Sequence, residues 1–578
     1  MPLSFLAKDA GFEMGLPTVE STATVITGPH TPGISATLSS ATSFSLTRYD
    51  KISASLTYRN ANTSLGTLTL AEGSPFVFYR AKTDSTFVIS GVGTVVDASS
   101  AYLRYTKAGH AYAIAGYDKT TISREGSTAT VRVPANGLAT FYALPDASTD
   151  PLHDLAGNEL ANVSTVSSTE NTHSLTTFTY HTANNRPTVF VQMSYSDAPS
   201  SQTTSLVQYD SIYGPMQATS GNEFTLSAPL VSASNSLDLT HLSDDEKKQI
   251  IASLQKDITS TSITAQDSYF AGKGLARAAN LLQLAESLGE ADKSAQLIAM
   301  LKSAFASRLA PTYFYYDTAL HGMAATTAAF GSEDFNDHHF HYGYFLYAAS
   351  ILASYDTSFL TEYRDRINLL AADIASYTGS KDFPLQRNYD AYAQHGWAAG
   401  LAPFADGNNQ ESSSEAINAW NGAALWGKVT KNDALEQSAT WMLSNESATA
   451  QRAWRIPSTT LQASYLKAYT SPVSSLNFGG KRTYGTFFSD EASAKLGIQL
   501  IPMVPSMQQF AKDGNEITST VNHTIAHDNF NVPLGDYILM YQALSDPTKA
   551  KNLLTKQTTI DDGNSKSYLE AWIFSRTN

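Results

Sequence analysis

The hydrophobic pattern of this chain changes near Ser243, and that change limits its possible folds more than any other feature. Between Thr22 and Tyr195, short apolar or alternating runs such as "PFVFYR" and "RPTVFVQMSY" are separated by Gly, Pro, Asn and Asp. Runs of this kind, rich in Val, Thr, Phe and Tyr, are typical of antiparallel strands, and none carries a helical stripe. We therefore expect a β-sandwich domain over residues 1–195.

A helical pattern follows after a short mixed stretch. Residues 196–242 contain turn-rich text and are expected to form a small connecting subdomain. From "SDDEKKQIIASLQKDI" onward, apolar residues recur at helical spacing, and Ser243 followed by acidic residues predicts an N-cap. The helical stretches over residues 243–578 are numerous enough for paired inner and outer rings, so we expect an α/α barrel.

Composition narrows the class of function. The 578 residues predict about two to four domains. The net charge is −14, and no run rich in Lys and Arg is present, which argues against nucleic acid and membrane surfaces as partners. No cysteine is present, which excludes disulfides, thiolate metal sites and cysteine nucleophiles. No stretch has the roughly 18 apolar residues of a membrane span.

The segment "DFNDHHFHYGY", beginning at Asp334, concentrates acids, histidines and tyrosines in a chain with only 16% charged residues. A helix that begins near Asp337 places Asp337, His341 and Tyr344 on one stripe. An acidic N-cap followed by histidines satisfied within a core is the simpler explanation for any one of these residues. A polar cluster of this size is costly to bury unless it is satisfied or used, so together they indicate a functional site.

A second segment, "ADGNNQESSSEAINAW", places Glu411 and Glu415 four residues apart, with serines between them that suit the start of a helix. Solvated acids at the positive end of a helix dipole explain this pattern simply. The alternative is an acid/base pair, in which neighbouring carboxylates take different protonation states. Glycoside hydrolysis needs such carboxylates and neither metal nor thiol.

Other chemistries have less support. A metal site could use the histidines of the first segment with a nearby acid, but the metalloprotease spacing is absent. There is no GxSxG elbow, and "AGKGLARA" lacks the spacing of a phosphate-binding loop and is expected to open an ordinary amphipathic helix. The candidate metal ligands are His338, His339, His341 and Asp334 or Asp337.

Both segments resemble signature segments of glycoside hydrolase family 81, the endo-β-1,3-glucanases. Further similarity is present in "AEGSPFVFYR", "DSIYGPM", "DAYAQHGWAAGL" and "KLGIQLIPMVP", in the order of the family. The resemblance implies a β-sandwich, a small α/β subdomain and an (α/α)6 barrel whose groove cleaves internal bonds of β-1,3-glucan with inversion. It implies no cofactor, and we expect a secreted monomer whose export signal is not part of this sequence.

The resemblance also implies roles for individual residues. Asp337 corresponds to the general acid, while Glu411 and Glu415 match the paired glutamates, with Glu411 favoured as the base although the sequence cannot separate the two. The segment around Tyr316 and Asp317 lacks the Trp usual in the family, and the segment around Tyr484 is divergent. The expected sugar contacts are His341, Asp390, His395, Tyr316, Asp317 and Tyr484.

Two further hypotheses come from other classes of protein. A noncatalytic β-glucan-binding protein would keep the groove without turnover, and it predicts binding that is unchanged by Asp337→Asn. A metal-dependent hydrolase predicts activity that is lost on chelation and restored by a divalent ion.

Overall fold

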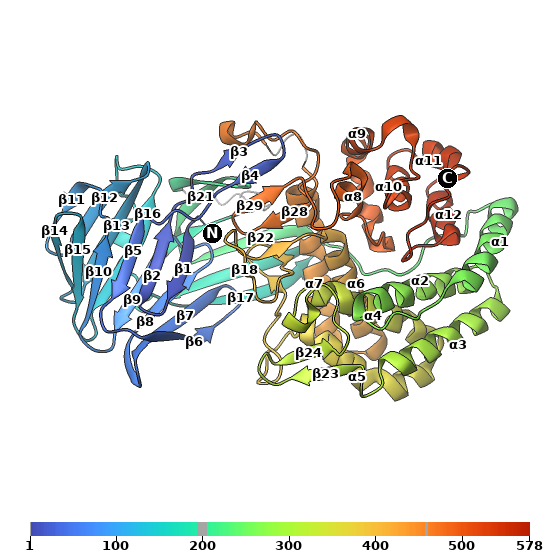
Figure 1. Cartoon of the computed structure of the whole chain (residues 1–578), viewed down its shortest axis with the longest axis horizontal. Helices are drawn as coiled ribbons and strands as arrows, with labels where there is room; N and C mark the ends of the chain where they lie inside the picture. Colours follow the sequence, from blue (N-terminus) through green and yellow to red (C-terminus); the bar gives the residue numbers. More distant parts are fainter. Residues whose placement is uncertain (1, 194–204, 457–460, 578) are drawn as a thin grey trace.

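The computed structural model describes residues 2–193, 205–456 and 461–577. The molecule is elongated, with strands at one end and helices at the other (Figure 1). The N-terminus lies beside the strands, and the C-terminus lies among the helices. A strand-rich N-terminal part and a helical C-terminal part are therefore both confirmed.

Two antiparallel sheets form the N-terminal end. Aromatic side chains from the two sheets interlock between them: Phe12 and Phe87 of one sheet meet Phe141 of the other, with ring centroids 5.0 and 5.5 Å apart. The alternating burial along the strands follows from the two-residue period of a strand. In spatial order, one sheet has β1 (Ser4–Lys8), β2 (Gly11–Gly15), β5 (Ile34–Leu38), β10 (Ser85–Ser90), β15 (Thr128–Val133) and β14 (Thr121–Glu125), and the other has β11 (Thr94–Ala98), β12 (Tyr102–Lys107), β13 (His110–Tyr117), β16 (Leu138–Leu144), β9 (Phe76–Ala81), β8 (Thr63–Ala71), β7 (Ser53–Asn60) and β6 (Ser43–Tyr49).

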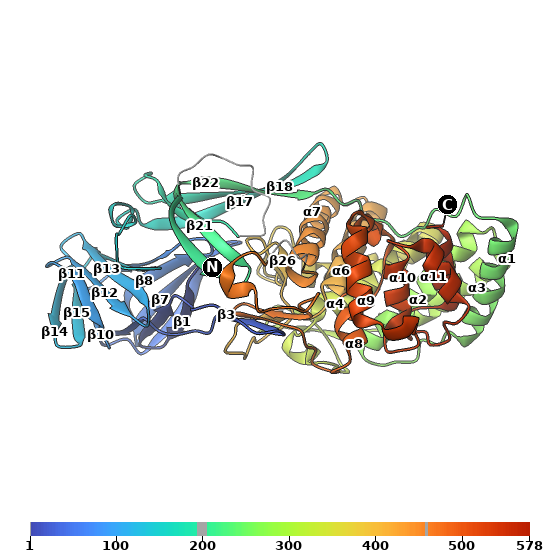
Figure 2. The ribbon, with the colours of Figure 1, turned by 90° about the horizontal axis from the view of Figure 1, so that it is seen from above.

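Two smaller sheets follow the sandwich in the chain. Figure 2 shows β17, β18 and β22 running from the sandwich toward helix α7 (Asp433–Thr449). These sheets cross the boundary expected at residues 195 and 196, because β18 pairs with β22 and β19 pairs with β21. The described residues 205–242 form strands and no helix, so the helical part of the expected α/β subdomain is not seen there. The sheets are β17 (Leu160–Glu170), β18 (His173–Thr182) and β22 (Glu223–Pro229), then β19 (Thr188–Val191), β21 (Gly214–Gly221) and β20 (Ser205–Ser211).

A fifth sheet joins the start of the chain to the helical half. In it β29 (Lys481–Thr483) pairs with β4 (Val25–Thr27), more than 400 residues away in sequence. This pairing extends residues 20–27 out of the sandwich and holds them against the loops of the helical half. The remaining strands of this sheet are β27 (Asn409–Gln410), β28 (Leu476–Phe478) and β3 (Glu20–Ser21), and two short hairpins are β23 (Phe314–Asp317) with β24 (Gly322–Ala325) and β25 (Tyr389–Asp390) with β26 (His395–Gly396).

The helical half begins where the sequence predicts it. Ser243 is the N-cap of the first helix and forms a capping box with Glu246. Within the described residues, none of the helices combines the length and apolarity needed to cross a bilayer. The helices are α1 (Asp244–Ser260), α2 (Ser268–Ser287), α3 (Ala291–Arg308), α4 (His338–Tyr355), α5 (Thr357–Ala375), α6 (Ser413–Thr430), α7, α8 (Ala492–Gly497), α9 (Gly514–Thr524), α10 (Gly535–Gln542), α11 (Pro547–Leu554) and α12 (Lys566–Phe574).

Helices α4 and α6 pack closely against each other and carry the candidate carboxylates at their N-terminal ends. Both are buried on nearly every side, which is the property of a helix in the interior of a helical array. Their approach depends on glycine, since a Cβ at Gly343 of α4 would lie 2.6 Å from the Cα of Ala419 in α6. The side chains at the two N-terminal ends are therefore held at fixed relative positions.

Candidate active site

Asp337 is the N-cap of α4, as the sequence predicts. Its backbone adopts the left-handed conformation, with φ at 58°, and its N–H donates to the carbonyl of Ala398 at 2.8 Å. Few residues other than glycine adopt this conformation, although Asp does so more readily than most, and such strain is common at functional sites. Burial raises the pKa of Asp337 well above its usual range, and the charges of Glu415 and Glu411 raise it further.

Glu415 lies in the first turn of α6 and is buried, with 2% of its surface exposed. The hydroxyl of Tyr344 donates to its Oε1 at 2.8 Å, so the stripe of α4 that begins at Asp337 reaches this glutamate. Burial raises the pKa of Glu415, and hydrogen bonds from Tyr344, Ser412 and Tyr269 oppose that rise. These donors stabilise the ionised carboxylate.

Glu411 lies just before α6 and is partly exposed. The backbone N–H of Phe487 donates to its Oε1 at 2.7 Å, and the side chain of Gln499 donates to its carbonyl oxygen. Burial raises the pKa of Glu411 to about 7, against the opposing hydrogen bond from Phe487 and with a contribution from the charge of Glu415. The charges of Glu411 and Glu415 act on the pKa of Asp337, and the charge of Glu415 acts on that of Glu411, so the three carboxyl groups lie close enough to influence one another.

The three histidines of the first segment point to different partners. Nδ1 of His338 lies 2.7 Å from Asp373 and its Nε2 lies 2.8 Å from the carbonyl of Ser332, so both ring nitrogens have partners within the protein. His339 Nε2 lies 3.1 Å from the amide oxygen of Gln410. Within the described residues, no group of three or more His, Asp or Glu side chains is arranged to hold a metal ion.

Of the three histidines, His341 is linked to the carboxylates through a shared neighbour, Tyr269. Its Nδ1 lies 2.8 Å from the hydroxyl of Ser268, and its ring is 5.3 Å from that of Tyr269, the same tyrosine that contacts Glu415. Burial lowers the pKa of His341 well below its usual range, so the ring is neutral. Its Nε2 is buried without a hydrogen-bond partner among the described residues, which leaves it free for a ligand hydroxyl.

The sequence pattern did not predict a role for Lys273. It placed this residue in a segment that is expected to open an ordinary amphipathic helix. The structure buries it in α2, where it pairs with Asp561 at 3.0 Å and with Asp562. Burial alone would lower its pKa, but these two acids raise it, so the side chain remains a cation. Its charge acts on Glu415 and lowers the pKa of that carboxyl. No signal in the sequence predicted this role, because Lys273 is one of several polar residues on an amphipathic helix and its partners lie almost 300 residues away.

Asp390 and His395 lie on the short hairpin β25–β26, next to the sandwich. Asp390 accepts hydrogen bonds from the backbone of Tyr392 and Ala393 and, at 2.9 Å, from the indole N–H of Trp397. His395 is fully buried against Trp397, and its Nε2 has no hydrogen-bond partner among the described residues. Both residues line a cavity that also contacts the sandwich.

The other three expected sugar contacts lie in partly exposed positions. Asp317 caps the turn of the β23–β24 hairpin by accepting from the backbone of Ala319 and Leu320. Tyr316, on the same hairpin, donates its hydroxyl to the carbonyl of Asp382 at 2.6 Å. The ring of Tyr484 lies under Lys495, with the ammonium 4.8 Å from its centroid. None of these contacts joins the three residues to the carboxylates, so their sugar-binding role stays a prediction.

Comparison with known proteins identifies the family of this site. The model of the glycosyl hydrolase family 81 C-terminal domain matches residues 241–574, more than half of the chain. The chain belongs to glycosyl hydrolase family 81. The matched residues include both carboxylate segments and all of the helices from α1 to α12.

Relatives and a solved structure agree with this family. A glucan endo-1,3-beta-D-glucosidase of Acetivibrio thermocellus is 35% identical over 54% of this chain and 41% of its own length. Another, of Thermobifida fusca, is 26% identical over 87% of this chain and 69% of its own length. A mutant structure of the family 81 protein from Clostridium thermocellum superposes with a TM-score of 0.89 at 26% identity, covering 99% of this chain and 83% of that one. The chain thus spans less than half of the first of these relatives.

Proposed function

We propose that this family 81 chain is an endo-acting glycoside hydrolase that cleaves internal β-1,3-glucosidic bonds of β-1,3-glucan with inversion. The observation that carries the proposal is the set of three carboxyl groups at the N-terminal ends of the adjoining helices α4 and α6, of which Asp337 has neighbouring acids and Glu415 has hydroxyl donors. One group must be an acid and another a base at the same pH for glycoside hydrolysis. The family and the names of the relatives supply the substrate class.

Asp337 is suited to be the general acid. Burial and two neighbouring carboxylates favour its protonated form, and the hydroxyl of its carboxyl group donates a proton to the glycosidic oxygen as the bond to the leaving sugar breaks. Water then attacks the anomeric carbon from the opposite face and loses its proton to a glutamate. An inverting mechanism requires the carboxyl groups of the acid and the base to lie roughly 6.5–9.5 Å apart, with the water between them.

The hydrogen bonds favour Glu415 as the base. Three hydroxyl groups and the charge of Lys273 support the ionised form of Glu415. For Glu411, a single backbone N–H opposes the rise in pKa that burial causes. A base must be ionised before it can take the proton of water. This assignment reverses the preference for Glu411 that followed from the family resemblance. Glu411 then acts as a neighbouring acid, and its charge, once it ionises near its pKa of about 7, helps to keep Asp337 protonated.

We also propose that the helices close into an (α/α)6 barrel. Helices α2, α4 and α6 adjoin one another in that order, and each is followed in the chain by a helix that packs against it. The nearly complete burial of α4 and α6, compared with the one-sided burial of α3 and α5, supports inner and outer rings. The loops at one end of such a barrel carry Asp337 and Glu411.

Three variants test the mechanism on a linear β-1,3-glucan, with cellulose as a control and a chelator present. Asp337→Asn and Glu415→Gln are each expected to lower kcat by about 10²- to 10⁴-fold, as expected for loss of a general acid or base. Glu411→Gln is expected to retain more activity than Glu415→Gln. NMR of the first products is expected to show the α-anomer.

The outcomes separate the alternatives. Azide should restore turnover to the base variant alone and give an α-linked glycosyl azide, so rescue of Glu411→Gln would return the base role to Glu411. A β-anomeric first product would overturn inversion. Binding without product release, unchanged by Asp337→Asn, would identify a noncatalytic binding protein, and loss of activity with the chelator would identify a metal-dependent hydrolase.

A further inference from the structure

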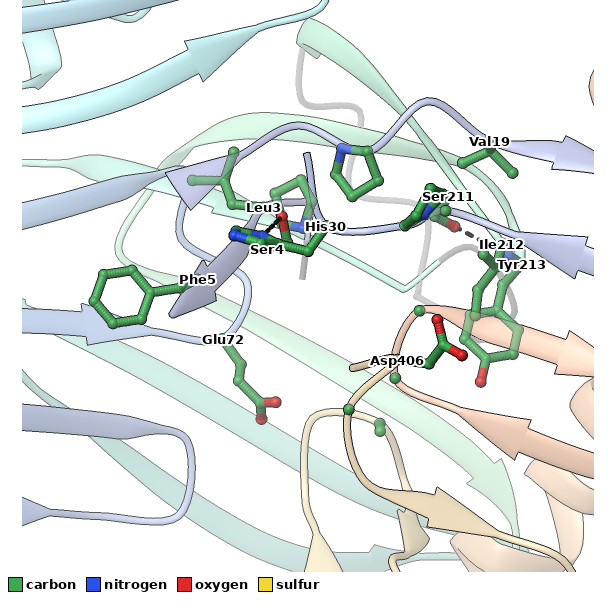
Figure 3. A pocket seen from close by; sticks show the side chains of 18 of the residues that line it. Leu3, Ser4, Phe5, Val19, His30, Glu72, Ser211, Ile212, Tyr213 and Asp406 are labelled. Atoms are coloured by element: carbon green, nitrogen blue, oxygen red, sulfur yellow. Dashed lines mark hydrogen bonds between the residues drawn. The ribbon is translucent and has the colours of Figure 1, made fainter. Parts of the chain in front are cut away.

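A cavity of about 680 Å³ lies where the sandwich meets the loops of the helical half. Figure 3 shows Phe5 and Glu72 on the sandwich side of this space and Asp406 and Tyr213 on the other side. We call it the junction chamber and define it by Phe5, Glu72, Asp390, Trp397, Phe404 and Asp406. It does not include the three carboxylates of the candidate active site.

The junction chamber adjoins the candidate active site at two points. Trp397 lines the chamber, and the next residue, Ala398, accepts the hydrogen bond from the backbone of Asp337 at 2.8 Å. Phe404 also lines the chamber and stacks on Phe487, with ring centroids 6.2 Å apart. Phe487 is the residue whose N–H binds Glu411, and its side chain is 59% exposed. A path of exposed aromatic surface therefore leads from Glu411 into the chamber.

The lining of the chamber fits a neutral polyol. The described residues that line it include four acids, Glu72, Asp210, Asp390 and Asp406, and neither Lys nor Arg, which disfavours an anionic ligand. Carboxylates accept hydrogen bonds from hydroxyl groups, and aromatic rings cover the apolar face of a sugar.

Polar groups in the chamber are also available to a ligand. The buried Nε2 of His395 lacks a hydrogen-bond partner among the described residues, and Asp390 holds the indole of Trp397 in place. Burial and the charge of Asp390 raise the pKa of Glu72 well above its usual range, and a hydrogen bond joins the two side chains, so Glu72 faces the chamber as part of a hydrogen-bonded acid pair. Sugar hydroxyl groups both donate and accept, so they can bond to the free Nε2 of His395 and to the carboxylate oxygens that line the chamber.

We propose that the junction chamber binds glucosyl residues of the same glucan chain that the three carboxylates cut, so that the sandwich domain forms part of the substrate site. Pockets of about 300–1,000 Å³ hold ligands of drug size, and the chamber therefore has room for about two or three sugar units. The inference rests on the proposed function, because it takes β-1,3-glucan as the ligand. It assigns a substrate contact to Glu72, a residue of the sandwich.

Filling the chamber tests this inference. A Cβ at Gly479, which lines the chamber, would meet the carbonyl oxygen of Asp406 at 3.4 Å and the Cα of Gly407 at 3.8 Å, which are ordinary contacts. Gly479→Phe is expected to lower kcat/KM by about 10-fold or more on long laminari-oligosaccharides, as expected for losing the apolar contact of one or two sugars. Its kcat/KM on the shortest oligosaccharide that the protein cuts is expected to change far less.

Two further measurements guard against a folding defect. Gly514→Phe adds the same bulk at an open glycine in α9, where the nearest atom outside its neighbours is the Cβ of Ser545 at 3.8 Å, and it should match wild type at every length. Glu72→Gln preserves the shape of the chamber, and in an Asp337→Asn background it should weaken calorimetric binding of long oligosaccharides while binding of short ones persists.

The results distinguish failure of the inference from failure of the proposed function. Gly479→Phe activity and Glu72→Gln binding that match their parent proteins at all lengths, or that fall equally at all lengths, would overturn the chamber as a glucan site and leave the proposed function standing. A wild-type protein that neither cuts nor binds β-1,3-glucan would overturn both.

Discussion

At the scale of single residues, environment separates carboxyl groups that look alike in sequence. Asp337 has neighbouring negative charges, Glu411 has one backbone donor, and Glu415 has several hydroxyl donors. The sequence predicted that Asp337 would begin a helix and that it shared a stripe with Tyr344, because both depend on helical spacing alone. It gave no sign that the backbone of Phe487 or the charge of Lys273 would act on the glutamates.

The raised pKa of Glu411 predicts a pH-dependent difference in stability. Its pKa is about 7 in the folded protein, above the ordinary value of 4.5, so the folded state binds more protons between these values. The resulting stabilisation is complete below the unfolded pKa and is lost as the pH rises through 7. Because Glu411→Gln cannot lose a proton, its Tm relative to wild type should rise from pH 5 to pH 8 in thermal melts.

A matched variant controls for the loss of a charge. Glu333→Gln removes an exposed acid that is close in sequence to Asp337. A Tm difference for Glu411→Gln that is the same at every pH would contradict the raised pKa.

At the scale of elements, the positions of the proposed catalytic groups depend on how closely α4 and α6 approach. Gly343 and Gly422 have no side chain where the two helices cross, and a Cβ at Gly422 would lie 2.8 Å from the backbone nitrogen of Tyr347. The sequence predicted both helices from their periodicity. It did not predict that α4 would be buried on almost every side, because that depends on the helices packed around it.

Gly343→Ala is expected to destabilise the protein and to lower activity. The added Cβ would lie 2.6 Å from the Cα of Ala419, so the helices must move apart, and overpacking of this kind typically costs about 1–3 kcal/mol. Separation of the helices would also shift Asp337 relative to Glu415. Denaturant unfolding and glucan hydrolysis measure the two effects.

Gly274→Ala is the matched control on α2. Its Cβ would meet only the side chain of Ile263, at 3.4 Å, and replacing a glycine inside a helix should stabilise by about 0.5–1 kcal/mol. Equal stability changes for the two variants would contradict the close approach of α4 and α6.

At the scale of the whole molecule, the sheet of β17, β18 and β22 joins the sandwich to the helices. The indole N–H of Trp441 in α7 donates to the hydroxyl of Thr176 in β18 at 2.8 Å. Lys51, from the sandwich, lies over the same ring, with its ammonium 4.6 Å from the ring centroid. One side chain of the helical half thus contacts both of the other parts, and we expect them to unfold together.

Thr176→Val is expected to destabilise this junction. Valine keeps the shape of threonine but leaves the buried indole N–H without its acceptor, which typically costs about 1–3 kcal/mol. Calorimetry should show a lower Tm, with the strand-rich and helical parts still melting in one transition. Thr177→Val, on the partly exposed face of the same strand, is the control, and two separate transitions in wild type would contradict a joined molecule.

The sequence by itself determined the order of strand-rich and helical parts, the N-caps at Ser243 and Asp337, and the segments that resemble family 81. These features depend on residues a few positions apart, whose periodicity and capping are local properties. Only the tertiary structure decided that Tyr344 meets Glu415, that Lys273 meets Asp561, and that Glu72 of the sandwich lies near Asp390. Such contacts join segments 70 to more than 300 residues apart, and burial and charge, which set the pKa values, arise only once those segments are packed together.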